Sequence, residues 1–376
     1  MKLSKALWVP FFTLFFILLQ LFCLYPVFAA GTTDNEASSD LATKTGDKET
    51  NHDRCCDTDS GIRMVSNAGF GDDIYHLHSA GKWMVNYKFM HTEMKGLRDG
   101  TTDVPVSDVI PMAGTKYGYM MAPTKMTMDM HMFMLMYGAT NRLTAMVMLP
   151  YLENRMDMLM NMGMGNNSEP PMRTSGLGDI ELRGIYKINE YLVGSLGLGM
   201  PTGGIKEEFS TMGMRFRDPY DMQLGSGTYD LKPALTYNGF SSDANWSWGA
   251  QAQYTYHNGK NKYDYRLGDN YKATCWFQRA FGPIIPSLRL AYNNTGKIKG
   301  QDPEIEKLLD PMMGASMPDA DTGNYGGRRL DGLIGLAYTI GRFSFGVEGG
   351  MPFYQNLNGL QLKTKWMLSA SIKAEF

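Results

Sequence analysis

The chain ends in the segment LQLKTKWMLSASIKAEF, residues 360–376. Apolar and polar side chains alternate along this segment with a period of two, which predicts a β-strand with one apolar face and one polar face. The apolar row holds Trp366, Leu368, Ala370, Ile372, Ala374 and Phe376, and the polar row holds Lys365, Met367, Ser369, Ser371, Lys373 and Glu375. The chain therefore finishes on an aromatic residue at the end of an amphipathic strand.

A terminal aromatic strand of this kind resembles the ending of bacterial outer-membrane β-barrels. The resemblance implies that the last strand closes the barrel and is recognised by the barrel-assembly machinery, with outer-membrane lipid around it. The composition agrees, because 42 Gly, 21 Tyr, 18 Phe and 6 Trp suit strands with aromatic girdles. The net charge of -2 argues against a nucleic-acid partner. We expect a protein of the bacterial outer membrane.

Three regions are predicted along the chain. Residues 1–30 read as a secretory signal peptide, with Lys2 and Lys5 before an apolar run that ends in Ala29 and Ala30. An uncleaved membrane anchor is the alternative, since the run is long enough to span a bilayer. Residues 31–80 are polar and predict a flexible periplasmic lead. Residues 81–376 are predicted to form the barrel.

Segments of period two predict an all-β, antiparallel transmembrane barrel of about twelve strands. Short turns and long loops alternate between these segments, as an outer-membrane barrel requires. The predicted strands lie near 82–94, 125–137, 142–158, 175–188, 191–201, 229–239, 244–257, 263–280, 285–296, 327–340, 342–353 and 360–376.

The alternation within strands also predicts which side chains face the lumen. Charged and polar residues are expected on the inner row, where they would set the selectivity of a pore. On one of these strands, Cys275 shares a row with Ala273 and Phe277 and is expected to face lipid as a small residue. The predicted pore-lining residues are Lys88, Asp129, His131, Asp179, Glu181, Arg183, Lys272, Arg289 and Glu348.

The chain contains 31 methionines, whose thioether sulfurs are soft ligands that suit Cu(I) or Ag(I). Between Met126 and Met136 every second residue is Met, and Asp129 and His131 occupy the opposite row. If the charged row faces the lumen, this stripe faces lipid as apolar filler. On the first strand the aromatic row faces lipid instead, so that Met84, Met90 and Met94 look inward and could contact a metal. The methionines from 156 to 164 run into a loop, where we expect exposed sulfurs.

Two adjacent cysteines in the lead form a second candidate for a soft metal. Cys55 and Cys56 follow His52, and a thiolate pair with an imidazole could hold Cu(I). In an oxidising periplasm a disulfide is the alternative. No resident cofactor is expected, and copper would bind only transiently.

Three motifs in order resemble an outer-membrane family named for the meta-pathway of phenol degradation. They are Ser175-Gly-Leu-Gly-Asp-Ile-Glu-Leu, Gly199-Met-Pro-Thr-Gly203 and Met351-Pro-Phe-Tyr-Gln-Asn-Leu-Asn-Gly-Leu-Gln361. The methionine-rich stretch from Met120 resembles a subgroup of that family. The resemblance implies a channel or transporter for a small solute.

The sequence leaves the solute and the class of function open. Copper or another soft metal ion is one predicted solute, and aromatic or other hydrophobic compounds are the alternative. A binding or structural barrel without conduction is a further alternative. No catalytic motif is present, so an enzyme is not expected. An outer-membrane hydrolase would require an activity that is lost in His131→Ala.

Overall fold

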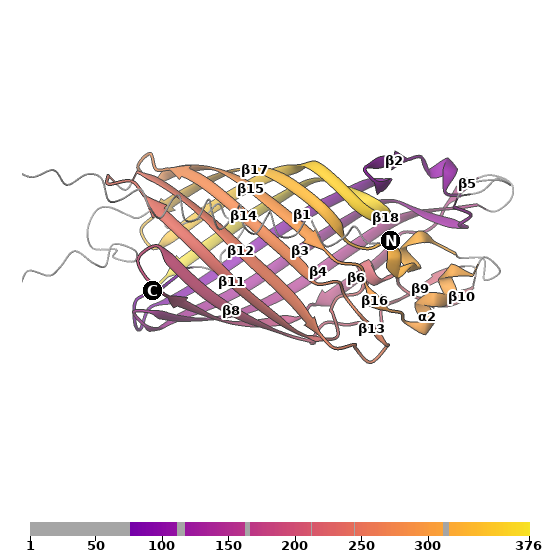
Figure 1. Cartoon of the computed structure of the whole chain (residues 1–376), viewed down its shortest axis with the longest axis horizontal. Coiled ribbons are helices and arrows are strands. Elements are labelled where there is room, and N and C mark those ends of the chain that lie inside the picture. Colours follow the sequence, from indigo (N-terminus) through magenta and orange to yellow (C-terminus); the bar gives the residue numbers. More distant parts are fainter. Residues whose placement is uncertain (1–75, 111–116, 162–165, 212, 244, 311–315) are drawn as a thin grey trace, which may run out of the picture. The chain divides into compact units, whose positions relative to one another are not determined.

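A computed structural model describes residues 76–376, apart from 111–116, 162–165, 212, 244 and 311–315. Within these residues the main sheet has 14 strands, and it closes on itself because β18 pairs with β1 (Figure 1). No helix of the described residues has the length and apolar character needed to cross a bilayer. The predicted all-β, antiparallel barrel is therefore confirmed.

Eleven labelled strands form the ring in the described part of the chain. Their bounds agree with the predicted strands to within a few residues at most ends, because the period of two marks each strand clearly. They are β1 (Trp83–Gly100), β3 (Met121–Thr140), β4 (Leu143–Asn161), β7 (Ile180–Lys187), β8 (Leu192–Met200), β11 (Tyr229–Phe240), β12 (Trp246–Asn258), β14 (Asn270–Arg279), β15 (Ile284–Thr295), β17 (Gly327–Ile340) and β18 (Phe343–Glu375).

The last labelled strand, β18, contains a reversal of the chain. Residues 343–357 pair with β17 and residues 357–375 pair with β1. Every neighbouring pair around the ring is antiparallel, so the ring closes only if the chain turns inside β18. Gly359 has φ 76 and supplies the left-handed conformation for this turn. The ring of described strands therefore has twelve crossing segments, as predicted.

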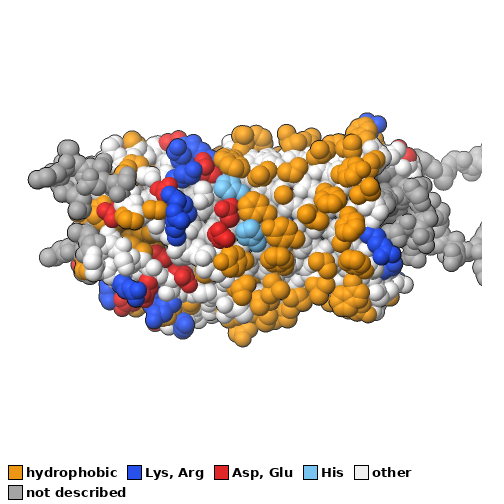
Figure 2. Space-filling view, turned by 180° about the vertical axis from the view of Figure 1, so that it is seen from behind, with side chains coloured by type: hydrophobic (Ala, Val, Ile, Leu, Met, Phe, Trp, Pro, Cys, Tyr) orange, Lys and Arg blue, Asp and Glu red, His pale blue; other side chains and the backbone are white. Residues whose placement is uncertain are grey.

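The outer face of the barrel is apolar over a broad band (Figure 2). On β17, Ile334 and Leu336 are 70% and 50% exposed, whereas Leu333 and Ala337, which flank this pair in the sequence, are buried. This alternation repeats on the other strands, and Cys275 lies on the exposed row as predicted. A continuous apolar outer band is unstable in water and stable in lipid.

Short turns and long loops occupy opposite rims, as the sequence predicted. The rim with short turns also carries the chain end, where Trp83 and Phe376 exchange two backbone hydrogen bonds of 3.1 and 2.8 Å. The other rim carries the small elements of the loops. These are β2 (Thr102–Val104), η1 (Val106–Asp108), β5 (Asn166–Ser168), β6 (Met172–Leu177), β9 (Glu208–Thr211), β10 (Met214–Arg217), η2 (Tyr220–Met222), β13 (Tyr265–Arg266), β16 (Lys299–Gly300), α2 (Pro303–Glu306), η3 (Lys307–Leu309), η5 (Pro318–Ala320) and η6 (Thr322–Asn324).

Candidate functional site

Methionine side chains cover the inner wall of β1, β3 and β4. On β3, Met132, Met134 and Met136 are 7%, 6% and 0% exposed, whereas Phe133 and Leu135 between them are 52% and 43% exposed. The prediction that this stripe faces lipid is therefore wrong. We call the inward set the methionine lane; it consists of Met84, Met90, Met94, Met126, Met128, Met130, Met132, Met134, Met136, Met146, Met148, Met156, Met158 and Met160.

The register of the three strands sorts the lane into cross-strand rows. Near the short-turn rim, Met136 of β3 lies opposite Met84 of β1 and Met146 of β4. Near the long-loop rim, the row Met94, Met126 and Met156 repeats this arrangement. Side chains directly opposite each other on one face have Cβ atoms about 5 Å apart, so neighbouring thioethers contact one another. Five of the methionines near the short-turn rim, Met84, Met132, Met134, Met136 and Met146, form a cluster of buried hydrophobic side chains, and the buried Asn86 and Lys88 lie opposite Met134 and Met132.

The residues predicted to line the pore on β3 lie on the outer face instead. Asp129 and His131 share the outward row with Phe133, and their partners lie on β1. The Asp129 carboxylate contacts His91 Nδ1 at 2.5 Å, and His131 Nδ1 contacts the Tyr87 hydroxyl at 2.8 Å. Their inward orientation was predicted wrongly, because β3 extends past the apolar band and its outward row becomes polar there. Phe133, Leu135 and Tyr137 on the same row were the signal for the outer face.

The end of the lane near the long-loop rim is covered by loop residues. Met156, Met158 and Met160 are 0%, 2% and 1% exposed and pack with aromatic and aliphatic side chains of the loops. The expectation of exposed sulfurs at these three positions is therefore wrong; residues 162–165 lie outside the described residues. The loop partners in this cluster include Phe216, Tyr220, Met222, Tyr265, Ile298, Ile305, Leu308 and Met317.

Ion pairs hold the covering loops together. Arg217 donates from Nη1 to Asp302 Oδ2 at 2.7 Å, and its guanidinium lies 3.9 Å from the centre of the Tyr263 ring. The backbone N–H of Asp302 donates to the Tyr220 hydroxyl at 3.0 Å. Burial in these loops raises the pKa of Asp218 to about 7, with nearby carboxylates adding to the shift. Described loop residues are thus packed together over the end of the lane near the long-loop rim.

The inner wall next to the lane is ionic, since Glu181 and Arg183 of β7 lie directly opposite Met148 and Met146 of β4. Glu181 of β7 accepts from Arg183 Nε at 2.7 Å and from Lys232 Nζ at 2.9 Å. On the other side of the ionic wall, Arg289 of β15 donates from Nε to Glu348 of β18 at 3.0 Å. These four predicted lining residues, Glu181, Arg183, Arg289 and Glu348, are buried and face the lumen. The structure brings them together as pairs, so the mixed charge is largely neutralised.

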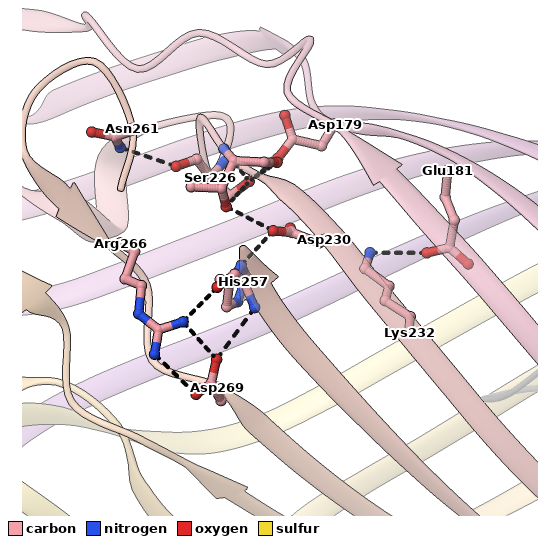
Figure 3. A network of polar contacts seen from close by, with 10 residues as sticks. Asp179, Glu181, Ser226, Asp230, Lys232, His257, Asn261, Arg266 and Asp269 are labelled. Atoms are coloured by element: carbon pink, nitrogen blue, oxygen red, sulfur yellow. Dashed lines mark hydrogen bonds and ion pairs between the residues drawn. The ribbon is translucent and has the colours of Figure 1, made fainter. Parts of the chain in front are cut away.

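A second polar network ties the ionic wall to the loops (Figure 3). Asp179 accepts from the backbone N–H groups of Gly203 and Ser226 at 2.9 and 2.7 Å. Asp230 of β11 accepts at 2.7 Å from the Thr228 hydroxyl and contacts His257 Nδ1 at the same distance. Asp179, a predicted lining residue, thus positions a loop at the rim.

Two lysines complete the predicted lining set. Lys88 of β1 is 3% exposed and lies on the inward row between methionines of the lane. Lys272 of β14 lies on the same row as the buried Thr274 and Trp276, and therefore also faces inward. Both positions agree with the orientation that the alternation predicted.

The lumen at the short-turn rim is crossed by residues 76–80. The backbone N–H of His78 donates to Thr144 Oγ1 of β4 at 2.9 Å, and His76 Nε2 lies 3.2 Å from Lys373 Nζ of β18. Between them, Leu77 packs against Ile185, Val193 and Trp276 on the opposite wall. We call residues 76–80 the plug segment, because they contact inner walls on several sides.

The structure describes the positions of only some of the predicted metal ligands. Met84, Met90 and Met94 lie on the inward row of β1, as the alternation predicted. His52, Cys55 and Cys56 lie outside the described residues, as do the predicted signal peptide and most of the lead. Within the described residues, no group of three or more His, Cys, Asp or Glu side chains is arranged to hold a metal ion.

Comparison with known proteins identifies the fold. No protein-family model and no curated protein matches the sequence. An outer-membrane channel from Pseudomonas putida F1 superposes with a TM-score of 0.51 at 13% identity, covering 81% of this chain and 98% of that chain. The toluene transporter TbuX of Ralstonia pickettii gives 0.41 at 10% identity, with 83% and 96% covered. The β domain of the Bordetella autotransporter BrkA gives 0.42 at 12% identity, with 79% and 100% covered. Together with the closed ring and the apolar outer band, the likeness in fold to the Pseudomonas putida F1 channel shows that this chain is a β-barrel of the bacterial outer membrane.

Proposed function

We propose that this protein is an outer-membrane channel for a small solute, which passes along the methionine lane. The observation that carries the proposal is the continuity of the lane, whose rows run from Met84 near one rim to Met94 near the other. A barrel that served only as a rigid scaffold would need apolar side chains on its lipid face, not on its lumen wall. The likeness in fold to an outer-membrane channel agrees with this function.

The two inner walls differ in what they can bind. Thioether side chains are polarisable and flexible, and they contact aromatic rings favourably by about 0.3–1.5 kcal/mol each. The ionic wall is already paired, since Glu181 is held by Arg183 and Lys232. A small aromatic or other hydrophobic compound could therefore contact the thioethers of the lane without breaking these ion pairs. This supports such a compound as the solute.

A soft metal ion is the second candidate solute. It is supported by the cluster near the short-turn rim, in which every buried member is a methionine. Cu(I) and Ag(I) prefer such thioether ligands over the hard oxygen ligands of the ionic wall. A hydrolase would require His131 as a catalytic residue. Its ring contacts the Tyr87 hydroxyl on the outer face of the barrel, so we do not propose an enzyme.

Flux measurements on reconstituted liposomes test the proposal. The double variant Met90→Asp/Met130→Asp places two carboxylates on one row of the lane, where Met90 lies opposite Met130. We expect the influx of phenol, a small uncharged aromatic probe, to fall roughly tenfold, because charged groups in an apolar passage are costly and retain water. The control is Met214→Asp, at a loop position that is 42% exposed.

The outcomes separate the candidates. Phenol influx that matches empty liposomes, with a folded barrel on a heat-modifiability gel, contradicts the channel and favours a non-conducting barrel. Influx of Ag(I) without influx of phenol selects the soft metal ion. Equal influx in the lane variant and in the Met214 control contradicts the methionine lane as the route.

A further inference from the structure

One buried imidazole nitrogen lies without a partner beside the lane. His78 is 6% exposed, and its buried Nε2 atom has no hydrogen-bond partner among the residues that the structure describes. A buried polar atom that lacks a partner costs about 1–3 kcal/mol, so such atoms need an explanation. His78 belongs to the plug segment, so its environment is set by the inner wall.

Contacts of His78 place its ring along one row of the lane. Its backbone N–H is held by Thr144 of β4, and its carbonyl oxygen lies against Gly138 of β3, since a Cβ built there would be 2.6 Å away. The ring nitrogen Nδ1 lies 3.9 Å from the Glu375 carboxylate of β18. The residue therefore reaches from β4 across β3 and β1 to β18.

The cross-strand row that begins next to Glu375 continues with three methionines. Glu375 lies directly opposite Met84, whose neighbours in the row are Met136 and Met146. All three side chains are buried, at 1%, 0% and 2% exposure. His78 therefore lies at the end of this row of three methionines, since Thr144 and Gly138 lie opposite each other two residues from Met146 and Met136.

We propose that His78 Nε2 and thioethers of Met84, Met136 and Met146 form a binding site for a soft monovalent metal ion, Cu(I) or Ag(I). Thioether sulfur and neutral imidazole nitrogen are the ligand types that such ions prefer, and neither carries a charge that burial would penalise. The site joins the plug segment to the barrel wall. It rests on the proposed channel function only for the route by which the ion arrives.

The protonation state of His78 agrees with a ligand role. Burial, together with His76 and Lys373, lowers the pKa of His78 to about 3, so the ring is neutral at physiological pH. The Glu375 carboxylate faces Nδ1 and favours the tautomer with the proton on that atom. Nε2 is then left with its lone pair available.

Isothermal titration with Ag(I), a redox-stable probe, tests the site. The full mature chain carries Cys55→Ser, Cys56→Ser and Cys275→Ser, so that no thiol competes for the ion. We compare His78→Phe and the triple variant Met84→Leu/Met136→Leu/Met146→Leu with a matched triple in the other row, Met94→Leu/Met126→Leu/Met156→Leu. We expect one site per chain whose affinity falls at least a hundredfold in the first two and less than threefold in the control.

Three results would overturn the site. They are an affinity unchanged by His78→Phe, a loss confined to the control triple, and no binding in the parent protein. A heat-modifiability gel shows that each variant is folded. Phenol influx is measured on the same samples. Absent Ag(I) binding together with normal phenol influx contradicts the metal site but not the channel. Normal Ag(I) binding without any phenol influx contradicts the channel but not the metal site.

Discussion

Gly138 allows the plug segment to lie against the inner wall, and Gly138→Ala should displace it. A Cβ built at this position would lie 2.6 Å from the His78 carbonyl oxygen and closer still to the carbonyl oxygen of Ser79. Ordinary contacts of a carbon atom have their optimum near about 3.5 Å, so the segment must retreat by on the order of 1 Å. Both contacts are with backbone atoms, which cannot rotate away as a flexible side chain can.

The size of the effect follows from the bonds that this retreat breaks. The plug segment donates from His78 to Thr144 at 2.9 Å, and the next residue, Gly81, donates to the Gly138 carbonyl at 2.8 Å. Each hydrogen bond contributes about 1 kcal/mol net. Loss of both would favour the displaced segment by about 2 kcal/mol, which is roughly a thirtyfold change in its population.

Single-channel recordings in planar bilayers measure this change. We expect Gly138→Ala to show a higher open probability than the parent protein, because the plug segment spends more time away from the wall. Gly184→Ala is the matched control: this glycine lies on strand β7, and a Cβ there meets no atom within 4 Å. Identical recordings for both variants would refute the idea that contact with β3 holds the plug segment in the lumen.

Three further predictions concern charges. Glu181→Gln leaves Arg183 and Lys232 without their shared carboxylate; the reversal potential should shift toward anion selectivity, with stability lower by about 3 kcal/mol. For Asp218, whose pKa burial raises to about 7, the native state keeps a proton that the unfolded chain has lost between about pH 4 and 7, so stability falls as pH rises through this window; Asp218→Asn should raise the thermal midpoint at pH 8 but not at pH 4. Asp129→Leu should leave ion selectivity unchanged, since this residue lies outside the lumen.

The strands and the rims were predictable because they depend on local alternation. β17 begins and ends where the period of two predicts, at Gly327 and Ile340. Each crossing segment must show one row to lipid, and this constraint acts on every strand independently of its neighbours. Long-range contacts were not needed to recognise the barrel.

The face of the methionine stripe could not be predicted by asking which row carries charge. β3 is 20 residues long, whereas an apolar band about 25 Å tall needs about half that length even with tilt. The rest of its outward row lies beyond the band, where Asp129 and His131 meet partners on β1. Aromatic residues mark the outward row more reliably than the charges mark the inward row, since Phe133 and Tyr137 gain nothing from a polar lumen.

The partners of the inner residues were beyond the reach of sequence for a different reason. The alternation along a strand specifies whether a side chain faces the lumen, but not which side chains of other strands it meets there. Lys232 reaches Glu181 from β11, and His78 reaches the row of Met84 only because the plug segment folds back over Gly138. The chemistry of a barrel lumen is thus decided by contacts between strands and by a segment that is not a strand. For this reason the sequence could nominate Met84 as a soft contact without revealing that Glu375, its neighbour on β18, lies 3.9 Å from His78 Nδ1.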